Sequence, residues 1–390
     1  MLTDSELMRL VGIKPQLEPN LDYGIGIVGA GHIVNWAHLP AYRKGGYNVV
    51  GIFDLAKDKA VGTAQKYEVP KVYDSLAELL ADPAVEVVDM ALAPTLNLRI
   101  GEQVIAAKKH FMCHKPMTTV YAEAVKLVED AKRANVKFAV NQNLRWDPAM
   151  WACRQLIHAD GLGKPVAGFI DHAFGGDLGL LGETYPPWYG KPLRHLYQKE
   201  QEVNVPPEAK PPPGPTRGSI LGDGVHIIDS LKVFFGVPKS VMANITGTPD
   251  NPRADTVNTI VLKYRDDFSI TMRLSYNNWW GESHLKFSFE GTDSIIRGDI
   301  GDYRRDFFKE GISPNDRLEI GVRVGQVKWV IPPFRGTWIP DAFQFSMGEL
   351  LKAIKHNTEP ETSGADNLST LRIIHAALDS AESGKAVDTA

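Results

Sequence analysis

Residues 24–34 read Gly-Ile-Gly-Ile-Val-Gly-Ala-Gly-His-Ile-Val, an apolar run that ends in closely spaced glycines and leads into a helical pattern. The turn after such a strand needs a glycine at Gly29, and Gly31 lets a pyrophosphate approach the backbone closely. The N-terminus of the following helix offers free N–H groups and a partial positive charge to phosphates. The stretch therefore predicts a Rossmann-type βαβ unit over residues 22–54 that binds a nicotinamide dinucleotide.

Asp54 stands at the end of the next apolar run, 23 positions after Gly31. A carboxylate at this spacing reaches the ribose hydroxyls of the adenosine and repels the 2′-phosphate of NADP, so the expected cofactor is NAD. Lys57 is close enough to keep NADP as the less favoured alternative. Val34 occupies the position of the third glycine, which implies a wider crossing of helix and strand rather than lost phosphate binding. The plain alternative is a glycine-rich turn and a helix-capping aspartate.

Short apolar runs alternate with helical spacing through the first third of the chain. This alternation gives right-handed βαβ crossovers and a parallel, doubly wound sheet. The expected strands are residues 23–28, 48–53, 86–92, 110–113 and 137–141, and the expected helices are 31–44, 57–67, 75–81, 96–108 and 119–134.

The pattern changes near residues 145–148. After one more helix, at 149–158, apolar and polar residues alternate and short turns join neighbouring runs, which indicates an antiparallel sheet. The fold class is therefore α/β, with an N-terminal arm (1–20), a Rossmann domain (21–144) and an α+β domain with a large, mostly antiparallel open sheet (145–390), interrupted by a long loop (175–217). Expected strands are 166–174, 238–247, 256–265, 268–278, 283–290 and 293–299, and the last helices are 341–356 and 365–383.

The composition is that of a globular protein, with 43% apolar and 23% charged residues. A net charge of −4 without a basic stripe argues against nucleic-acid binding. No apolar run has the length of a membrane span, and the charged first twenty residues do not resemble a secretory signal. Cys113 and Cys153 are too few for a disulfide framework, so a reducing cytoplasm is the expected location.

Five further stretches combine turn residues with polar side chains. They read Ala-Pro at 93–94, His-Phe-Met-Cys-His-Lys-Pro at 110–116, Asn-Leu-Arg-Trp-Asp-Pro at 143–148, Gly-Leu-Gly-Lys-Pro at 161–165 and Gly-Asp-Gly-Val-His-Ile-Ile-Asp at 222–229. Together with the glycine motif they resemble the Gfo/Idh/MocA family of sugar and polyol oxidoreductases over nearly the whole chain. The second stretch resembles the family's strand ending in Glu-Lys-Pro, and the last resembles its Asp-x-Gly-x-His-x-x-Asp helix.

Two positions of the site depart from the family pattern. His114 replaces the Glu before the lysine, and Gly222 replaces the Asp four positions before the histidine. Asp223 follows one position later, which on a helix is a rotation of about 100°. Asp223 therefore needs a local adjustment of the helix to take over the role. These departures bear on the substrate and the reaction rather than on the fold.

The resemblance implies a catalytic group and a cofactor site. Lys115 would orient the reacting hydroxyl, and His226, with an ordinary pKa of about 6.5, would be the general base beside Asp223. The expected cofactor contacts are Gly29, Gly31, His32, Ile33, Asp54, Ala93, Pro94, Asn97, His114, Lys115, Asn143, Arg145 and Trp146. The expected substrate contacts are Lys115, His172, Trp188, Arg194, His195, Asp223 and His226, and no metal is expected.

The catalytic candidates also have plain structural interpretations. Lys115 could be a surface lysine after a strand, and His226 could be a core histidine on an apolar helix. Asp223 could cap a helix over 224–235 instead of entering the site. Asp229 is expected to serve structure.

Aromatic faces and polar groups together bind sugars. The possible stacking platforms are Trp146, Trp188, Trp279, Trp280 and Trp338, and the densest cluster of potential ligand groups in the long loop is Trp188, Tyr189, Arg194 and His195. That loop could close over the substrate or reach a neighbouring subunit. The strand period does not show whether Asp171 or His172 faces the cleft.

Three functions are compatible with these observations. The first is an NAD-dependent oxidoreductase acting on a secondary hydroxyl of a sugar, glycoside, inositol or related polyhydroxy compound. The second is a redox-neutral enzyme with retained NAD that cleaves glycosides or epimerises its substrate, and the third is a non-catalytic dinucleotide or sugar sensor. The expected partner is a small carbohydrate or polyol, with no nucleic acid and no membrane, and the resemblance implies a homodimer or homotetramer.

Overall fold

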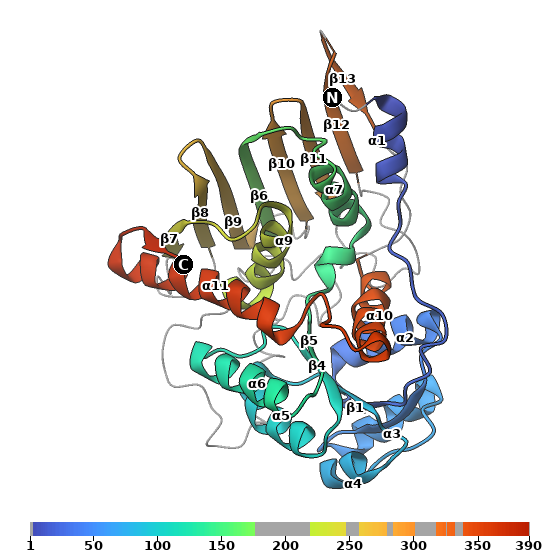
Figure 1. Cartoon of the computed structure of the whole chain (residues 1–390). Helices are drawn as coiled ribbons and strands as arrows, with labels where there is room; N and C mark the ends of the chain where they lie inside the picture. Colours follow the sequence, from blue (N-terminus) through green and yellow to red (C-terminus); the bar gives the residue numbers. More distant parts are fainter. Residues whose placement is uncertain are drawn as a thin grey trace, which may run out of the picture.

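The computed structural model describes residues 3–175, 219–246, 257–278, 284–300, 317–324, 326–331 and 338–389. The candidates Trp188, Tyr189, Arg194 and His195, and the platforms Trp279 and Trp280, lie outside the described residues. Two sheets organise the described part of the chain, one below the other in Figure 1.

The first sheet is parallel, as the alternating pattern predicted. Its five strands run in the order β2-β1-β3-β4-β5, so the chain reverses its direction of winding between β1 and β3. Ligands of doubly wound sheets bind outside the carboxyl ends of the strands at such a reversal. The strands are β1 (Ile25–Val28), β2 (Val49–Phe53), β3 (Val87–Met90), β4 (His110–His114) and β5 (Phe138–Asn141). The helices are α2 (Leu39–Gly45), α3 (Lys57–Tyr67), α4 (Leu76–Ala81), α5 (Asn97–Ala106) and α6 (Tyr121–Arg133).

The second sheet is the large, mostly antiparallel sheet expected after residue 145. Its order is β13-β12-β11-β10-β6-β9-β8-β7-β14, and β6 and β9 form its parallel pair. The strands expected from alternation are β6 (Pro165–Gly175), β7 (Ser240–Thr246), β8 (Val257–Arg265), β9 (Phe268–Asn278), β10 (His284–Gly291) and β11 (Ser294–Ile300). Three strands were not expected: β12 (Arg317–Val324), β13 (Gln326–Val330) and β14 (Val387–Asp388).

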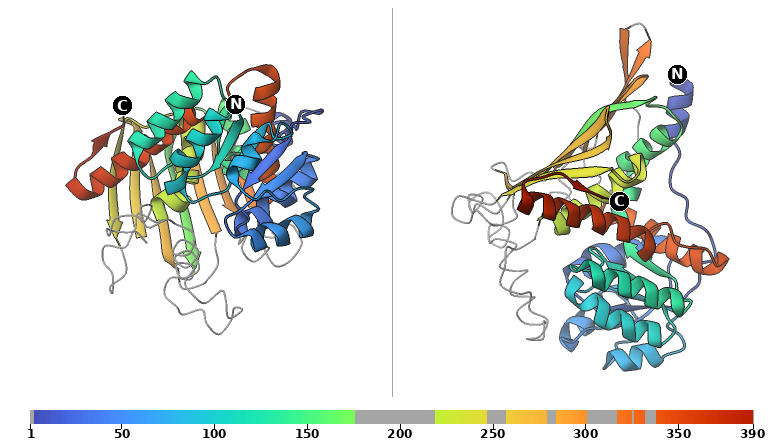
Figure 2. Two further views of the ribbon diagram at one scale, coloured as in Figure 1. Left: turned by 90° about the horizontal axis from the view of Figure 1, so that it is seen from below. Right: turned by 60° about the vertical axis from the view of Figure 1, so that its left-hand side comes forward.

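Helices cover one face of the large sheet and separate it from the parallel sheet (Figure 2). They are α7 (Pro148–His158), α9 (Val225–Phe235) and α11 (Gly364–Ser383). Phe169 and Met242 are exposed on the sheet, and the described helices leave the other face uncovered in Figure 2. Exposed apolar side chains on an uncovered sheet are where a second copy would be expected, and the oligomeric state stays a prediction.

The last two helices return the chain to the first sheet. In α10 (Asp341–His356), Phe343 and Met347 share an apolar core with Val34 and Ala37, which follow the glycine motif. The packing of α10 therefore joins the nucleotide-binding half, although the sequence placed it in the second domain.

The start of the chain is more ordered than the expected polar arm. Helix α1 (Asp4–Val11) begins at Thr3, whose side chain and that of Glu6 form a capping box. Its buried side chains, Leu7 among them, belong to the same apolar core as α7. None of the helices described has the length and apolar character needed to cross a membrane.

Candidate active site

The glycine turn lies at the reversal point of the parallel sheet. Gly29 has φ of +110°, and a Cβ atom there would stand 2.6 Å from the carbonyl oxygen of Ala91, so only glycine fits. At Gly31 a Cβ atom would meet nothing within 4 Å, which leaves open space above the turn. This open turn suits the close approach of a pyrophosphate to the backbone.

Asp54 ties this turn to the end of β2. Its Oδ2 accepts the N–H of Ala30 at 2.7 Å, and its Oδ1 accepts the N–H of Ala56 at 2.8 Å. Each carboxylate oxygen keeps a second lone pair that can accept a ribose hydroxyl. The ammonium of Lys57 pairs with Asp74. The turn and the carboxylate therefore fit a dinucleotide.

The helix after the turn begins irregularly. Val34 is fully buried at the first residue of a π-helical turn, Val34–His38. The imidazole of His32 stacks on the indole of Trp36 with centroids 5.7 Å apart, and Ile33 packs on the apolar core. On the other side of the reversal point, Ala93 precedes a 3-10 turn that starts at Pro94.

Asn97 supports the segment that carries Lys115. Its side chain is fully buried, and its Nδ2 donates to the carbonyl oxygen of Met117 at 2.9 Å. Longer contacts reach the carbonyls of His114 and Pro116, at 3.4 and 3.5 Å. This amide, expected at the cofactor, thus holds the chain where β4 ends and Lys115 begins.

Lys115 reaches the start of the helix that carries the histidine. Its side chain is 13% exposed, its Nζ lies 3.5 Å from Oδ1 of Asp223, and it donates to the carbonyl oxygen of Gly222. Burial lowers the pKa of Lys115, and the Asp223 carboxylate opposes part of that effect. Gly222, which departs from the family pattern, and Asp223, which follows it, both contact the lysine.

The adjustment that Asp223 needs is visible in the backbone. Residues Ile220–Gly224 form a π-helical turn, and the regular helix α9 starts only at Val225. A π turn changes the angle at which side chains leave the helix, and such turns are frequent at functional sites. Asp223 therefore projects toward Lys115 from within a π turn, not as the cap of a regular helix.

His226 follows on the first turn of α9 and is 4% exposed. Burial lowers its pKa well below the ordinary value, and the Lys115 ammonium adds to the effect. His172 is buried on the helix-covered face of β6 and acts electrostatically on His226. Asp171 faces the other way and accepts a hydrogen bond from Arg273 at 2.9 Å, which settles the ambiguity of the strand period.

A second group of buried polar side chains lies behind His114 and was not anticipated. Nδ1 of His38 lies 2.6 Å from Oδ2 of Asp89, which also accepts the hydroxyl of Tyr42 at 2.8 Å. The ring of His38 is 5.7 Å from that of His114. Burial lowers the pKa of His114 well below its ordinary value, and the neighbouring Lys115 contributes.

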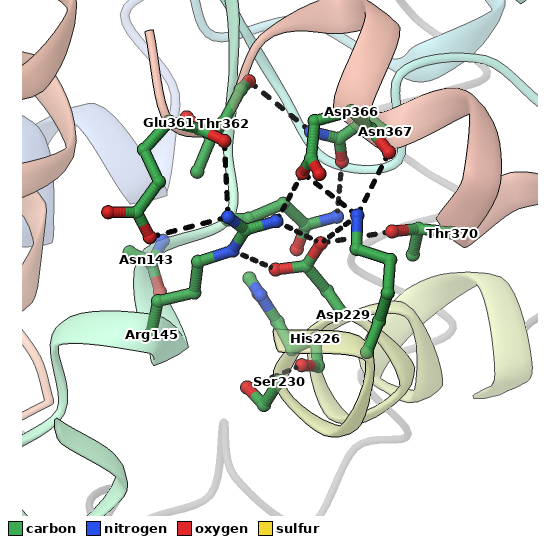
Figure 3. A network of polar contacts seen from close by, with 12 residues as sticks. Asn143, Arg145, His226, Asp229, Ser230, Glu361, Thr362, Asp366, Asn367 and Thr370 are labelled. Atoms are coloured by element: carbon green, nitrogen blue, oxygen red, sulfur yellow. Dashed lines mark hydrogen bonds and ion pairs between the residues drawn. The ribbon is translucent and has the colours of Figure 1, made fainter. Parts of the chain in front are cut away.

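Arg145, an expected cofactor contact, is engaged in a buried network of ion pairs, and its contact with a cofactor stays a prediction. Its guanidinium is 3% exposed and donates two hydrogen bonds, of 2.5 and 2.7 Å, to the carboxylate of Asp229. It also reaches the carbonyl of Glu361 at 3.2 Å and pairs with Asp366 (Figure 3). Trp146 is buried in the apolar core. The crossover therefore anchors α9 to α11, and Asp229 serves structure as predicted.

The structure thus gathers part of the predicted site. Lys115, Asp223 and His226 lie together near the carboxyl end of β4, with His114 and His172 next to them. The side chain of Asn143 binds Trp338, through Oδ1 at 2.6 Å from the indole nitrogen. Asn97 and Arg145 make the structural contacts described above.

Comparison with known proteins gives the family. The N-terminal model of the Gfo/Idh/MocA family, described as an oxidoreductase family with an NAD-binding Rossmann fold, matches residues 23–142. The C-terminal α/β model of the same family matches residues 203–389.

Named relatives cover most of the chain. D-apiose dehydrogenase of Paraburkholderia graminis is 23% identical over 94% of this chain and 88% of its own. The NADP-dependent scyllo-inositol 2-dehydrogenase of Bacillus subtilis is 24% identical over 93% and 95%. The structure of levoglucosan dehydrogenase with NADH and levoglucosan matches with a TM-score of 0.75 and 18% identity, over 94% of this chain and 99% of the other. The chain therefore belongs to the Gfo/Idh/MocA family of oxidoreductases.

Proposed function

We propose that this chain is an NAD-dependent oxidoreductase that transfers a hydride between nicotinamide and a secondary hydroxyl of a sugar, glycoside, inositol or related polyhydroxy compound. The observation that carries the proposal is the meeting of Lys115, Asp223 and His226 at the edge of the sheet that holds the glycine turn. D-apiose, scyllo-inositol and levoglucosan, in the names of the similar proteins, are polyhydroxy compounds of this class.

Oxidation of an alcohol needs a hydride acceptor and a base for the hydroxyl proton. Bound nicotinamide would supply the hydride acceptor. Lys115 donates a hydrogen bond to the reacting oxygen and fixes its position, and Asp223 holds the ammonium in place at 3.5 Å. His226, kept neutral by burial, takes the hydroxyl proton.

The direct test follows absorbance at 340 nm while purified protein and NAD are mixed with a panel of pentoses, hexoses, glycosides and inositols. An increase with any of these substrates supports net oxidation. Release of an aglycone that requires NAD, without net NADH, would favour the redox-neutral alternative. Binding of NAD with no turnover of any panel member would contradict the proposal and favour a sensor.

The pH profile provides a prediction about His226. A base must be neutral to act, and the pKa of His226 is lowered below 6.5, so kcat/KM for oxidation should stay level through pH 6.5 and decline only below it. The decline on the alkaline side should begin below pH 10.5, because the pKa of Lys115 is also lowered. The measurement is kcat/KM from pH 5 to 10 in constant ionic strength. An acid limb centred above 6.5 would argue against His226 as the base, and His226→Gln should remove the limb.

Asp54 leads to a prediction about the choice between NAD and NADP. Asp54→Asn keeps an oxygen for one backbone N–H but removes the charge that would repel a 2′-phosphate. Because like charges in contact cost several kcal/mol, the ratio of kcat/KM for NADP to that for NAD should rise roughly 100-fold. Asp74→Asn is the matched control, since it removes an exposed carboxylate that pairs with Lys57 rather than with the glycine turn. An unchanged ratio in Asp54→Asn would remove Asp54 from cofactor selection.

A further inference from the structure

Trp338 is held in a fixed orientation by the crossover segment. Its indole N–H donates to Oδ1 of Asn143 at 2.6 Å, and the two side chains are 5% and 1% exposed. Nδ2 of Asn143 donates in turn to Oδ1 of Asn141 at the end of β5, at 3.1 Å. An indole is a donor only, so the amide oxygen of Asn143 must face it, and the orientation of both groups follows.

The indole of Trp338 packs on the imidazole of His226. The ring centroids are 5.5 Å apart and the planes are nearly perpendicular, at 85°. Such an edge-to-face pair restricts both rings and is worth about 0.5–1.5 kcal/mol beyond the area it buries. Nδ1 of His226 has no hydrogen-bond partner within the described parts of the chain. The packed indole is therefore a contact that restricts the angle of this imidazole.

We propose that Trp338, anchored by Asn143, is a positioning residue that fixes the imidazole of His226 opposite Lys115 and excludes water from it. The proposal rests on the proposed function, in which His226 carries the proton. It assigns Trp338 to the acid–base group rather than to stacking with a sugar. It also assigns Asn143 to the support of that group rather than to the cofactor.

Substitution of Trp338 changes none of the charged and titratable residues that surround His226. They are Lys115 and His114 from the end of β4, Asp223 from the π turn, Asp229 from α9 and His172 from β6. Burial is the largest cause of the lowered pKa of His226, so admitting water should raise that pKa toward 6.5. Removal of the indole should therefore raise the pKa of His226, which a general loss of stability would not do.

The test compares Trp338→Leu, Trp338→Phe and Asn143→Ala. Trp338→Leu should lower kcat roughly 10–100-fold with little change in the KM for NAD, because the base loses its alignment. The acid limb of kcat/KM should move to higher pH. Trp338→Phe keeps a ring against His226 and should show a smaller shift in the same direction, and Asn143→Ala should lie between the two.

Trp151→Phe is the matched control, because the indole of Trp151 also donates one hydrogen bond, to the carbonyl of Ile13 at 2.8 Å, away from the site. It should leave the pH profile unchanged. If Trp338→Leu and Trp151→Phe lower stability alike and neither moves the acid limb, the positioning role is overturned.

A readout without turnover separates this inference from the proposed function. In protein labelled with ¹³C at histidine, the resonance lost in His226→Gln identifies His226, and its titration can be followed directly. A rise of that pKa in Trp338→Leu supports the positioning role, and an unchanged pKa overturns it. If His226→Gln leaves turnover intact, the base role that the proposed function gives to His226 fails instead, and the titration still decides whether Trp338 positions the imidazole.

Discussion

Lys115→Ala is expected to lower kcat/KM for alcohol oxidation by roughly 10²–10⁴-fold, the range found when a positioned acid–base group is removed. Lys115 is the cation that meets both Asp223 and the carbonyl of Gly222 at the carboxyl end of β4. An alanine there leaves no donor for the reacting oxygen. It also removes the ammonium that lies 3.5 Å from Oδ1 of Asp223. The fall should appear mainly in kcat, with NAD affinity retained.

Lys137→Ala is the matched control for this variant. The side chain of Lys137 is 12% exposed, close to the 13% of Lys115, and pairs with Glu359 at 3.2 Å. It precedes β5 and so lies at the amino end of the parallel sheet, away from the site. Steady-state kinetics and circular dichroism on both variants make the comparison. Equal losses of activity would show that Lys115 acts through stability alone.

Local chemistry made the nucleotide-binding half predictable. The Gly29 turn works only with glycine, because of its positive φ and the nearby carbonyl of Ala91, and this need is readable as a motif. The strands of the parallel sheet are short apolar runs between helices, so their number and type follow from periodicity. The helix α10, at Asp341–His356, begins and ends where its pattern does.

Pairing between distant side chains was not predictable to the same extent. The sequence places Arg145 in a crossover motif but does not show that Asp229 and Asp366, from two other helices, would surround its guanidinium. The rotation of Asp223 depends on a π turn, which leaves the spacing of apolar residues almost unchanged. These features are set by tertiary packing, which periodicity does not record.

The helix and strand that the sequence did not predict were missed for related reasons. Strand β14, Val387–Asp388, is two residues long and exists through its pairing with β7. Helix α1 has only eight residues, too few to be stable alone, and depends on burying Leu7 and its neighbours against the core of the second half. Each is formed by a tertiary contact rather than by a strong local preference.

Asp229→Asn is expected to cost about 3–5 kcal/mol of unfolding free energy, the usual result of removing one partner from a buried ion pair. Asp229 is 1% exposed, and its loss of charge leaves Arg145 and Lys232 buried with a shortage of negative charge. Thr370 also loses a charged acceptor, since its hydroxyl donates to Oδ1 of Asp229 at 3.0 Å. Chemical denaturation of both proteins at pH 7 measures the difference.

Asp171→Asn is the matched control, because it neutralises an aspartate whose partner Arg273 is 54% exposed. Exposed pairs contribute at most about 1 kcal/mol, so this variant should stay close to the parent protein.

The pH dependence of stability gives a second check on Asp229. Burial would raise the pKa of Asp229, but Arg145 and Lys232 outweigh burial and hold this pKa below its ordinary value of 3.8. The carboxylate therefore stabilises the fold fully above pH 3.8, and its contribution is lost as pH falls through the lowered pKa. The difference in unfolding free energy between Asp229→Asn and the parent protein should therefore narrow below pH 3.8. If Asp229→Asn loses no more unfolding free energy at pH 7 than Asp171→Asn does, the buried network adds no net stability and serves only to orient α9.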